Sequence, residues 1–248
     1  MAKNKEVKFL NSRMHTMSMA ESVALINHNL ETGEFFQHVV VNVAKLVNMQ
    51  TDKTLYDSVQ ACDLINIDGQ GVVLGARFSG LDVPERVAGI DLFFELLKMS
   101  ENKGFPVFLL GAKPDVLEQA QLNVKKQYPD LKIAGYHHGY FWDDEQAVVD
   151  KIKASGAKLL FVAITSPKKE NFINKWRDQL GVNFVMGVGG TFDVVSGNVK
   201  RAPAWMQQYG LEWLFRVIQE PRRMFMRYLV TNTKFINYVV KEKLKVKA

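Results

Sequence analysis

Runs of apolar residues that alternate with helical segments constrain this chain more than any other feature. The runs cover residues 63–67, 106–110, 158–164 and 184–188, and helices are expected at 115–126, 145–154 and 168–179. A strand that is apolar along nearly every residue has to be covered on both faces. Such strands, separated by helices, are typical of a parallel sheet. The sequence therefore predicts an α/β fold, a mostly parallel sheet with helices on both faces.

Local signals predict further elements before and between these runs. Ser18 and Glu21 form a capping box, in which each side chain binds a free backbone N–H at a helix start, and this predicts a helix over 19–29. The remaining expectations are a strand at 35–41, a helical stretch at 46–59 and a strand at 131–135.

Length and cysteine content narrow the class of protein. The 248 residues suffice for a sizeable core, and they fit one large domain with an appendage as well as two domains. Cys62 is the only cysteine, so an intramolecular disulfide is impossible and a reducing compartment is expected. We find neither a signal-peptide pattern nor an apolar run of about 18 residues, so no transmembrane helix is expected.

The positive charge is concentrated at one end of the chain. Residues 200–248 contain eleven Lys or Arg and three Glu, a balance of +8, whereas the rest of the chain has a balance of −2. A charge asymmetry of this kind indicates an anionic partner, which the charge alone leaves open as membrane, phosphate or nucleic acid.

The same segment has an amphipathic pattern. Arg222, Arg223 and Arg227 share helical spacing with Phe225 and Leu229, as in helices that lie on an anionic membrane surface. Nucleic acid is disfavoured, because the sequence has no helix-turn-helix, RNA-binding aromatic motif or zinc module. A solvated basic face remains the simplest alternative.

Four loops that follow predicted strands carry residues suited to ligand binding. In parallel α/β folds these loops form one crevice at the carboxyl ends of the strands. Glycines there let backbone N–H groups approach phosphate, and lysines add positive charge. The candidates are Gly69 and Gly71 in the first loop, Gly111 and Lys113 in the second, Lys169 and Glu170 in the third, and Gly189, Gly190 and Asp193 in the fourth.

Asp68 is the strongest candidate for chemistry. It ends an apolar strand and precedes glycines, so a carboxylate there faces the crevice and suits a general base. The alternative is an Asp that only caps the following helix. Asp193 occupies a similar place, with loop ordering as an equally good interpretation.

Several common enzyme classes fit poorly. The run Gly187–Gly190 begins like a dinucleotide fingerprint, but Phe192 replaces its last glycine and no acidic residue follows at the required distance. A Walker motif is absent. His137 and His138 are adjacent and suit a loop better than a metal site, and Asp143-Asp144 suits a helix cap. We therefore expect neither a metal site nor a cofactor.

Taken together, the motifs resemble the bacterial WecG/TagA/CpsF glycosyltransferase family. The similarity extends from about residue 7 to Leu229. Its motifs are Asn66–Val73, Pro84–Asp91, Phe108–Gly111, Gly139–Phe141, Pro167–Glu170, Gly187–Asp193, Val199–Pro203, Gly210–Arg216 and Glu220–Arg223.

This resemblance implies an inverting transferase without a bound metal, which moves a sugar from a UDP-sugar to a polyprenyl-diphosphate-linked saccharide in cell-surface polysaccharide synthesis. It implies a Rossmann-like catalytic domain over 1–198 and a basic helical appendage over 199–248 that completes the site and contacts the membrane. The location implied is the inner face of the bacterial cytoplasmic membrane. The sugar is left open among N-acetylmannosamine, its uronic acid and glucose, as is any homo-oligomer.

The resemblance also implies roles for individual residues. Asp68 matches the catalytic base, Arg86 a motif arginine near the substrate, and Asn42 a polar residue lining the crevice. Two positions differ from the family: Lys169 stands where glutamine is frequent, and Val40 where some members have threonine. Contact with the membrane and the lipid diphosphate is expected from Arg201, Arg216, Arg222, Arg223 and Arg227. A non-catalytic membrane-surface binding protein of the same fold is the alternative function.

Overall fold

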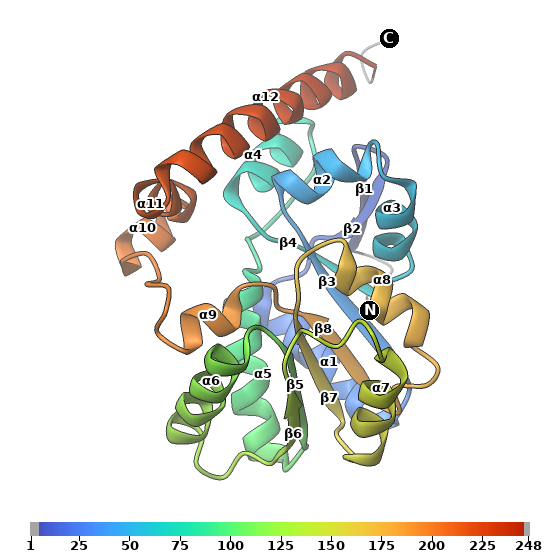
Figure 1. Cartoon of the computed structure of the whole chain (residues 1–248). Coiled ribbons are helices and arrows are strands. Elements are labelled where there is room, and N and C mark those ends of the chain that lie inside the picture. Colours follow the sequence, from blue (N-terminus) through green and yellow to red (C-terminus); the bar gives the residue numbers. More distant parts are fainter. Residues whose placement is uncertain (1–4, 246–248) are drawn as a thin grey trace.

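A computed structural model describes residues 5–245 and, within them, every side chain except those of Arg223 and Lys245. The expectation for the Arg223 side chain therefore lies outside the described residues. Within this range the chain forms an eight-stranded sheet in the order β1-β2-β4-β3-β8-β7-β5-β6 (Figure 1). Only the β1–β2 pair is antiparallel. The predicted α/β class with a mostly parallel sheet is confirmed.

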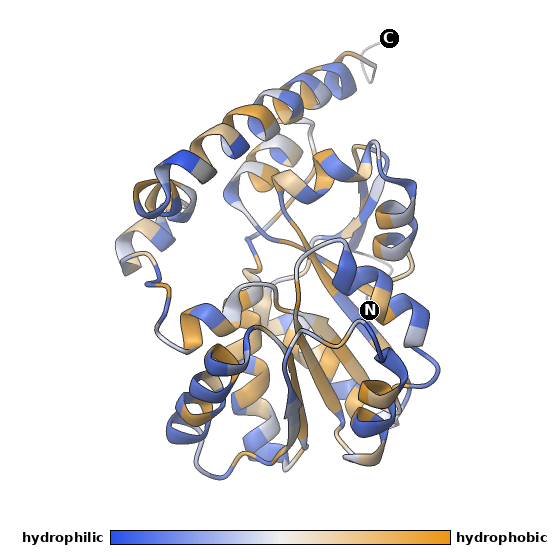
Figure 2. Cartoon of the chain, viewed as in Figure 1, coloured by the Kyte–Doolittle hydropathy of each residue, from blue (hydrophilic) through white to orange (hydrophobic). Residues whose placement is uncertain are grey.

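The strands are short and mostly buried. Their bounds are β1 Glu6–Phe9, β2 Ser12–His15, β3 Phe36–Val41, β4 Leu64–Ile67, β5 Val107–Gly111, β6 Ile133–His137, β7 Leu159–Ala163 and β8 Phe184–Gly187. Successive residues of a strand point to opposite faces. In β5, Val107 and Leu109 accordingly belong to one core cluster, and Phe108 and Leu110 to another. Both faces are therefore covered, as the unbroken apolar runs require (Figure 2).

Twelve helices are described around this sheet. They are α1 Met19–Thr32, α2 Val43–Met49, α3 Lys53–Gln60, α4 Gln70–Phe78, α5 Gly89–Lys103, α6 Pro114–Gln127, α7 Glu145–Ala154, α8 Lys168–Trp176, α9 Thr191–Val195, α10 Ala204–Gln208, α11 Glu212–Gln219 and α12 Pro221–Lys245. Helices α1, α5, α6 and α9 contribute to the core on one face, and α2, α3, α4, α7 and α8 to the clusters on the other. None of the described helices is long and apolar enough to cross a membrane.

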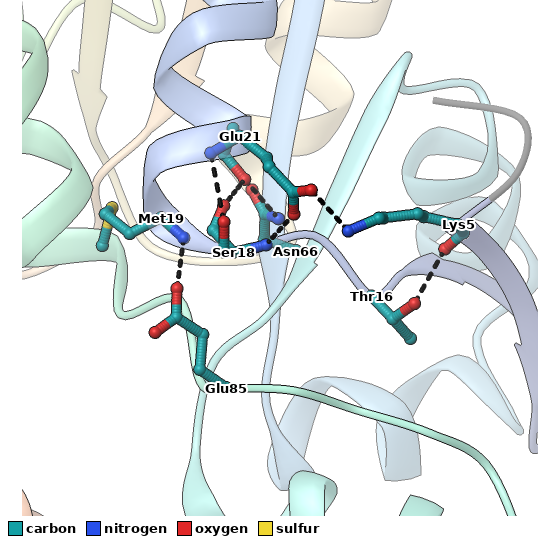
Figure 3. Close-up of polar contacts among 8 residues, drawn as sticks. Lys5, Thr16, Ser18, Met19, Glu21, Asn66 and Glu85 are labelled. Atoms are coloured by element: carbon teal, nitrogen blue, oxygen red, sulfur yellow. Dashed lines mark hydrogen bonds and ion pairs between the residues drawn. The ribbon is translucent and has the colours of Figure 1, made fainter. Parts of the chain in front are cut away.

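Local capping explains where several helices begin. The Ser18 hydroxyl accepts a hydrogen bond from the Glu21 N–H at 3.2 Å, and the Glu21 carboxylate accepts one from the Ser18 N–H at 2.9 Å (Figure 3). The predicted capping box is therefore confirmed. The stretch predicted as helical over 46–59 is two helices instead, because Asp52 caps a new helix by accepting from the Leu55 N–H. The strand predicted at 131–135 lies at 133–137 instead, and the buried Leu131 belongs to the segment between a turn and this strand.

The C-terminal helices form an appendage that is docked on the body at its far end. Figure 1 shows α12 lying across α4, with α10 and α11 beyond the end of α9. Phe235 and Val239 of α12 are buried, and both contact α4 where Gly75 leaves room for them. The Lys243 ammonium also donates to the Phe78 carbonyl at 2.7 Å. Helix α12 is thus anchored through its C-terminal half.

Candidate active site

Asp68 lies at the carboxyl end of β4, where the chain leaves the sheet. Its carboxylate Oδ2 accepts a hydrogen bond from the Gly89 N–H at 3.4 Å, at the first residue of α5. Helix α4 begins after Gly69, and no side chain caps it. Asp68 therefore does not cap the following helix, which was the alternative interpretation from the sequence. Its carboxylate faces the N-terminus of a different helix.

Glycines shape the surroundings of this carboxylate. Gly69 has a φ of +108°, which L side chains rarely adopt, so the turn after Asp68 requires glycine. A Cβ on Gly89 would lie 3.3 Å from Val40, and one on Gly71 would lie 2.9 Å from Val43. The Val40 and Val43 side chains consequently pack closely against the backbone at Gly89 and Gly71, where a larger residue would have to displace them.

The charges around Asp68 come from the body and from the appendage. Burial raises the pKa of the Asp68 carboxyl above its ordinary value. Glu212 of α11 adds to the rise, whereas Arg86, the Gly89 N–H and Arg216 act to lower the pKa. A carboxylate with a raised pKa is a better proton acceptor than an exposed one, which suits a general base.

Arg86 lies in the loop before α5 and is held there by its neighbours. Glu85 accepts a hydrogen bond from the Met19 N–H at the start of α1, at 2.5 Å (Figure 3). Val87 donates to the Ile67 carbonyl at 2.9 Å, at the end of β4. The guanidinium of Arg86 then pairs with Glu212 at 2.5 Å. The loop thus fixes the backbone of Arg86, and the appendage fixes its side chain.

Arg201 belongs to the same ionic network. Its guanidinium pairs with Asp91 of α5 at 2.7 Å and with Glu212 at 3.5 Å. One nitrogen of this guanidinium, Nη2, is buried and makes no hydrogen bond within the described residues. Two arginines and two carboxylates therefore join the loop before α5, α5 itself and α11.

Asn42 stands beside the Asp68 loop, at the end of β3. Its side chain caps α2 by accepting from the Lys45 N–H at 3.0 Å. Its Cβ lies 3.7 Å from the position that a Cβ on Gly69 would take. The structure therefore brings Asn42, Asp68, Gly69 and Arg86 to one end of neighbouring strands, and it assigns Asn42 a capping hydrogen bond.

Lys169 and Glu170 form a second ionic cluster, at the start of α8. Glu170 Oε1 accepts from Lys45 of α2 at 2.8 Å and from Lys169 at 2.9 Å, and all three side chains are buried. Glu170 Oε2 is buried without a hydrogen-bond partner in the described part of the chain. The stem of Lys169 passes so close to Gly187 that a Cβ there would come within 2.5 Å. These groups are thus packed between α2, α8 and the end of β8.

The other predicted residues lie farther along the same edge of the sheet. A Cβ on Gly111 would come within 2.4 Å of the Ala163 carbonyl, so β5 and β7 can approach only with glycine there. Lys113 is exposed at the start of α6, and Gly189 and Gly190 precede α9. Asp193 orders the loop after α9 through its backbone carbonyl, which accepts from Val199 at 3.0 Å.

Of the predicted appendage arginines, Arg216 has a charge that acts on the pKa of Asp68. Arg216, Arg222 and Arg227 are exposed. Large exposed apolar side chains also occur on α10, at its C-cap, and on α11 and α12, and two more lie on α4. They are Trp205, Tyr209, Trp213, Ile218, Phe225, Met226, Leu229, Val230, Ile236, Val240 and Leu244, with Leu74 and Phe78. We call this set the apolar appendage surface.

Candidate metal ligands do not gather in the described residues. No group of three or more His, Cys, Asp or Glu there could hold a metal ion. Asp144 caps α7 by accepting from the Ala147 N–H at 3.1 Å, which confirms its predicted role as a helix cap. His137 contacts the backbone carbonyl of His138 through its ring.

Sequence reasoning missed three residues that hold the two clusters together. Asp91 and Glu212 fall inside motifs that the resemblance singled out, so membership of a motif was the available signal. No sequence signal pointed to Lys45, because a lysine in the first turn of a helix is usually exposed. Only the packing of α2 against the start of α8 shows its role.

Comparison with known proteins identifies the family of this chain. The family described as "Glycosyl transferase WecG/TagA/CpsF family" matches residues 7–248. An N-acetylglucosaminyldiphosphoundecaprenol N-acetyl-beta-D-mannosaminyltransferase from Bacillus subtilis (strain 168) is 38% identical over 191 residues, which cover 77% of this chain and 73% of that protein. The protein of the same name from Bacillus spizizenii is 39% identical over 187 residues, 75% of this chain and 72% of its own length. The chain therefore belongs to the WecG/TagA/CpsF family of glycosyltransferases.

Proposed function

We propose that this enzyme transfers a sugar from a UDP-sugar to a polyprenyl-diphosphate-linked saccharide, with inversion and with Asp68 as the general base. The observation that carries the proposal is the Asp68 carboxylate, partly buried at the end of β4 with a raised pKa and two arginines nearby. The names of the Bacillus relatives support the acceptor class and favour N-acetylmannosamine as the sugar. Lys169 at a position where glutamine is frequent keeps the uronic acid and glucose as further donors to test.

The chemistry follows from the charges around Asp68. Its carboxylate takes the proton of the acceptor hydroxyl while the hydroxyl oxygen forms a bond to the anomeric carbon. The bond from that carbon to UDP breaks on the opposite side, which inverts the centre. Negative charge grows on the departing diphosphate, where guanidinium groups and backbone N–H groups stabilise it. The charges of Arg86 and Arg216 act on the Asp68 carboxyl and lower its pKa.

Asp68→Asn tests this assignment. General-base catalysis contributes about 10²–10⁴-fold, so the variant should lose at least about 100-fold in kcat. UDP release is measured with a panel of UDP-sugars and undecaprenyl-diphosphate-linked N-acetylglucosamine. Thermal unfolding and binding of UDP to the variant serve as controls, and both should match the parent protein. Near-normal turnover by Asp68→Asn would overturn the assignment.

We further propose that the apolar appendage surface rests on an anionic membrane at its cytoplasmic face. Exposed apolar side chains such as Phe225 and Met226 stand beside the exposed Arg222 and Arg227, which is the combination found in helices at membrane surfaces. The long-chain lipid acceptor proposed above would also be presented at such a surface.

Charge reversal separates this surface from the rest of the molecule. Each basic residue near an anionic bilayer contributes about 1 kcal/mol, so Arg222→Glu with Arg227→Glu should weaken partitioning by about 30-fold or more. Sedimentation with vesicles containing phosphatidylglycerol measures the change. Lys98→Glu with Lys126→Glu makes the same charge change on exposed body residues and should bind as the parent protein does. Equal losses for the two pairs would contradict a specific membrane role of the appendage.

A further inference from the structure

Glu212 joins two arginines that come from different parts of the chain. It is the first residue of α11, and its carboxylate pairs with Arg86 through one oxygen and with Arg201 through the other. The side chains of Arg86 and Glu212 are only 16% and 19% exposed. An ion pair this shielded from water is stronger than one at the surface, so it can fix the position of a guanidinium.

The backbone around Glu212 is fixed against the Asp68 loop. Gly210, two residues earlier, has a φ of +70°, and a Cβ there would come within 2.6 Å of Gln70. Gln70 is the first residue of α4, two positions after Asp68. Side chains at position 210 would therefore push α11 away from the loop. The close contact places the Glu212 carboxylate within electrostatic reach of Asp68.

Arg86 could pair with either of two carboxylates, Asp68 or Glu212, and it pairs with Glu212. Within the described residues the guanidinium pairs with Glu212, whereas Asp68 accepts from the Gly89 N–H. An ion pair between Arg86 and Asp68 would neutralise the base and lower its pKa. Glu212 draws Arg86 into a different pair and leaves the Asp68 carboxylate able to accept a proton.

We propose that Glu212 is a positioning residue, through which the appendage holds Arg86 beside Asp68 without letting the two pair. The proposal rests on the proposed function, in which Asp68 is the base. It makes the appendage part of the catalytic arrangement through one named carboxylate. Arg86 then remains available to stabilise the charge that grows on the diphosphate.

The pH dependence of activity tests whether Glu212 positions Arg86 in this way. The groups whose charges or hydrogen bonds act on the pKa of Asp68 are Arg86 from the loop before α5, the Gly89 N–H of α5, and Glu212 and Arg216 of α11. Removing the Glu212 charge takes away a repulsion that raises the pKa of Asp68, and it frees Arg86 to pair with Asp68. Both changes lower that pKa. The acid limb of the kcat/KM profile should therefore move to lower pH.

Glu212→Gln is the decisive variant, because the amide keeps the size of the side chain and loses the charge. We expect the shifted acid limb, together with a fall in kcat at neutral pH of about 10–100-fold from misplacement of Arg86. Glu6→Gln is the matched control, since Glu6 pairs with Arg13 at 3.3 Å on the β1–β2 hairpin. It should leave the profile and kcat unchanged.

The outcomes separate this inference from the proposed function. Turnover by Asp68→Asn would overturn the proposed function and the inference with it. Loss of turnover in Asp68→Asn, combined with a Glu212→Gln profile that superimposes on the parent profile, would overturn the inference alone. A Glu212→Gln protein with a lower melting temperature but parent kcat and pH profile would show a structural role only, and would overturn the inference as well.

Discussion

Two carboxylates in this enzyme each pair with two cations, but their surroundings differ. Glu170 is shared by Lys45 and Lys169, and Glu212 by Arg86 and Arg201. The first cluster lies wholly inside the body, between α2 and α8. The second connects the body to the appendage. Their comparison contrasts an ionic cluster buried inside the body with one for which we propose a role in catalysis.

The Glu170 cluster carries an excess of positive charge. Its side chains are less than a tenth exposed. Burial by itself would raise the pKa of Glu170, but the two ammonium groups outweigh it and hold that pKa at about 2. Burial and the neighbouring Lys45 lower the pKa of Lys169 to about 8. One carboxylate thus compensates two buried cations incompletely.

The Glu212 cluster is closer to electrical balance. Asp91 supplies a second carboxylate to Arg201, so two guanidinium groups face two carboxylates. Its side chains also keep more contact with water than those around Glu170. Separating the ion pairs of a balanced, partly exposed network costs less free energy than separating those of a buried network with excess charge. This difference is consistent with our proposal that substrates bind beside Asp68.

The largest effect in this comparison is expected from Glu170→Gln. Removing the carboxylate leaves two buried ammonium groups without a counter-ion, which costs about 3–5 kcal/mol. Urea unfolding at neutral pH measures the free energy of unfolding. Glu212→Gln makes the same chemical change in the more exposed cluster and should cost clearly less. A larger loss for Glu212→Gln than for Glu170→Gln would reverse our ranking of the two clusters.

Much of the body could be predicted from sequence because its signals are local. The strands β5, β7 and β8 are continuous apolar runs, β4 is interrupted only by Asn66, and the cap at Asp144 is decided within three residues. Asp68 could be placed at a strand end for the same reason. The β1–β2 hairpin had no such signal, because Leu10 and Asn11 form its turn with positive φ and without a glycine.

The ionic clusters could not be predicted in this way. Lys45 and Glu170 are 125 positions apart in the sequence, and Arg86 and Glu212 are 126 apart. Which cation pairs with which carboxylate depends on how helices pack, and no local periodicity encodes that. From the sequence we expected Lys169 and Glu170 to bind substrate, Arg86 to act in catalysis and Arg201 to contact the lipid. The structure adds their ion-pair partners.

The smallest effect is expected from Lys169→Gln, which changes a cation of the Glu170 cluster instead of its carboxylate. The substitution removes the excess charge and leaves Lys45 and Glu170 as a balanced pair, so stability at pH 7 should rise by about 1 kcal/mol.

In the parent protein the pKa of Lys169 is about 8 when folded, against 10.5 ordinarily. Between these values the unfolded chain binds more protons, so parent stability should increase from pH 8 to pH 10.5. Lys169→Gln lacks that titration and should show a flatter curve in urea unfolding over the same range. Parallel curves for the two proteins would mean that Lys169 is fully compensated by Glu170, and the contrast with the Glu212 cluster would then rest on burial alone.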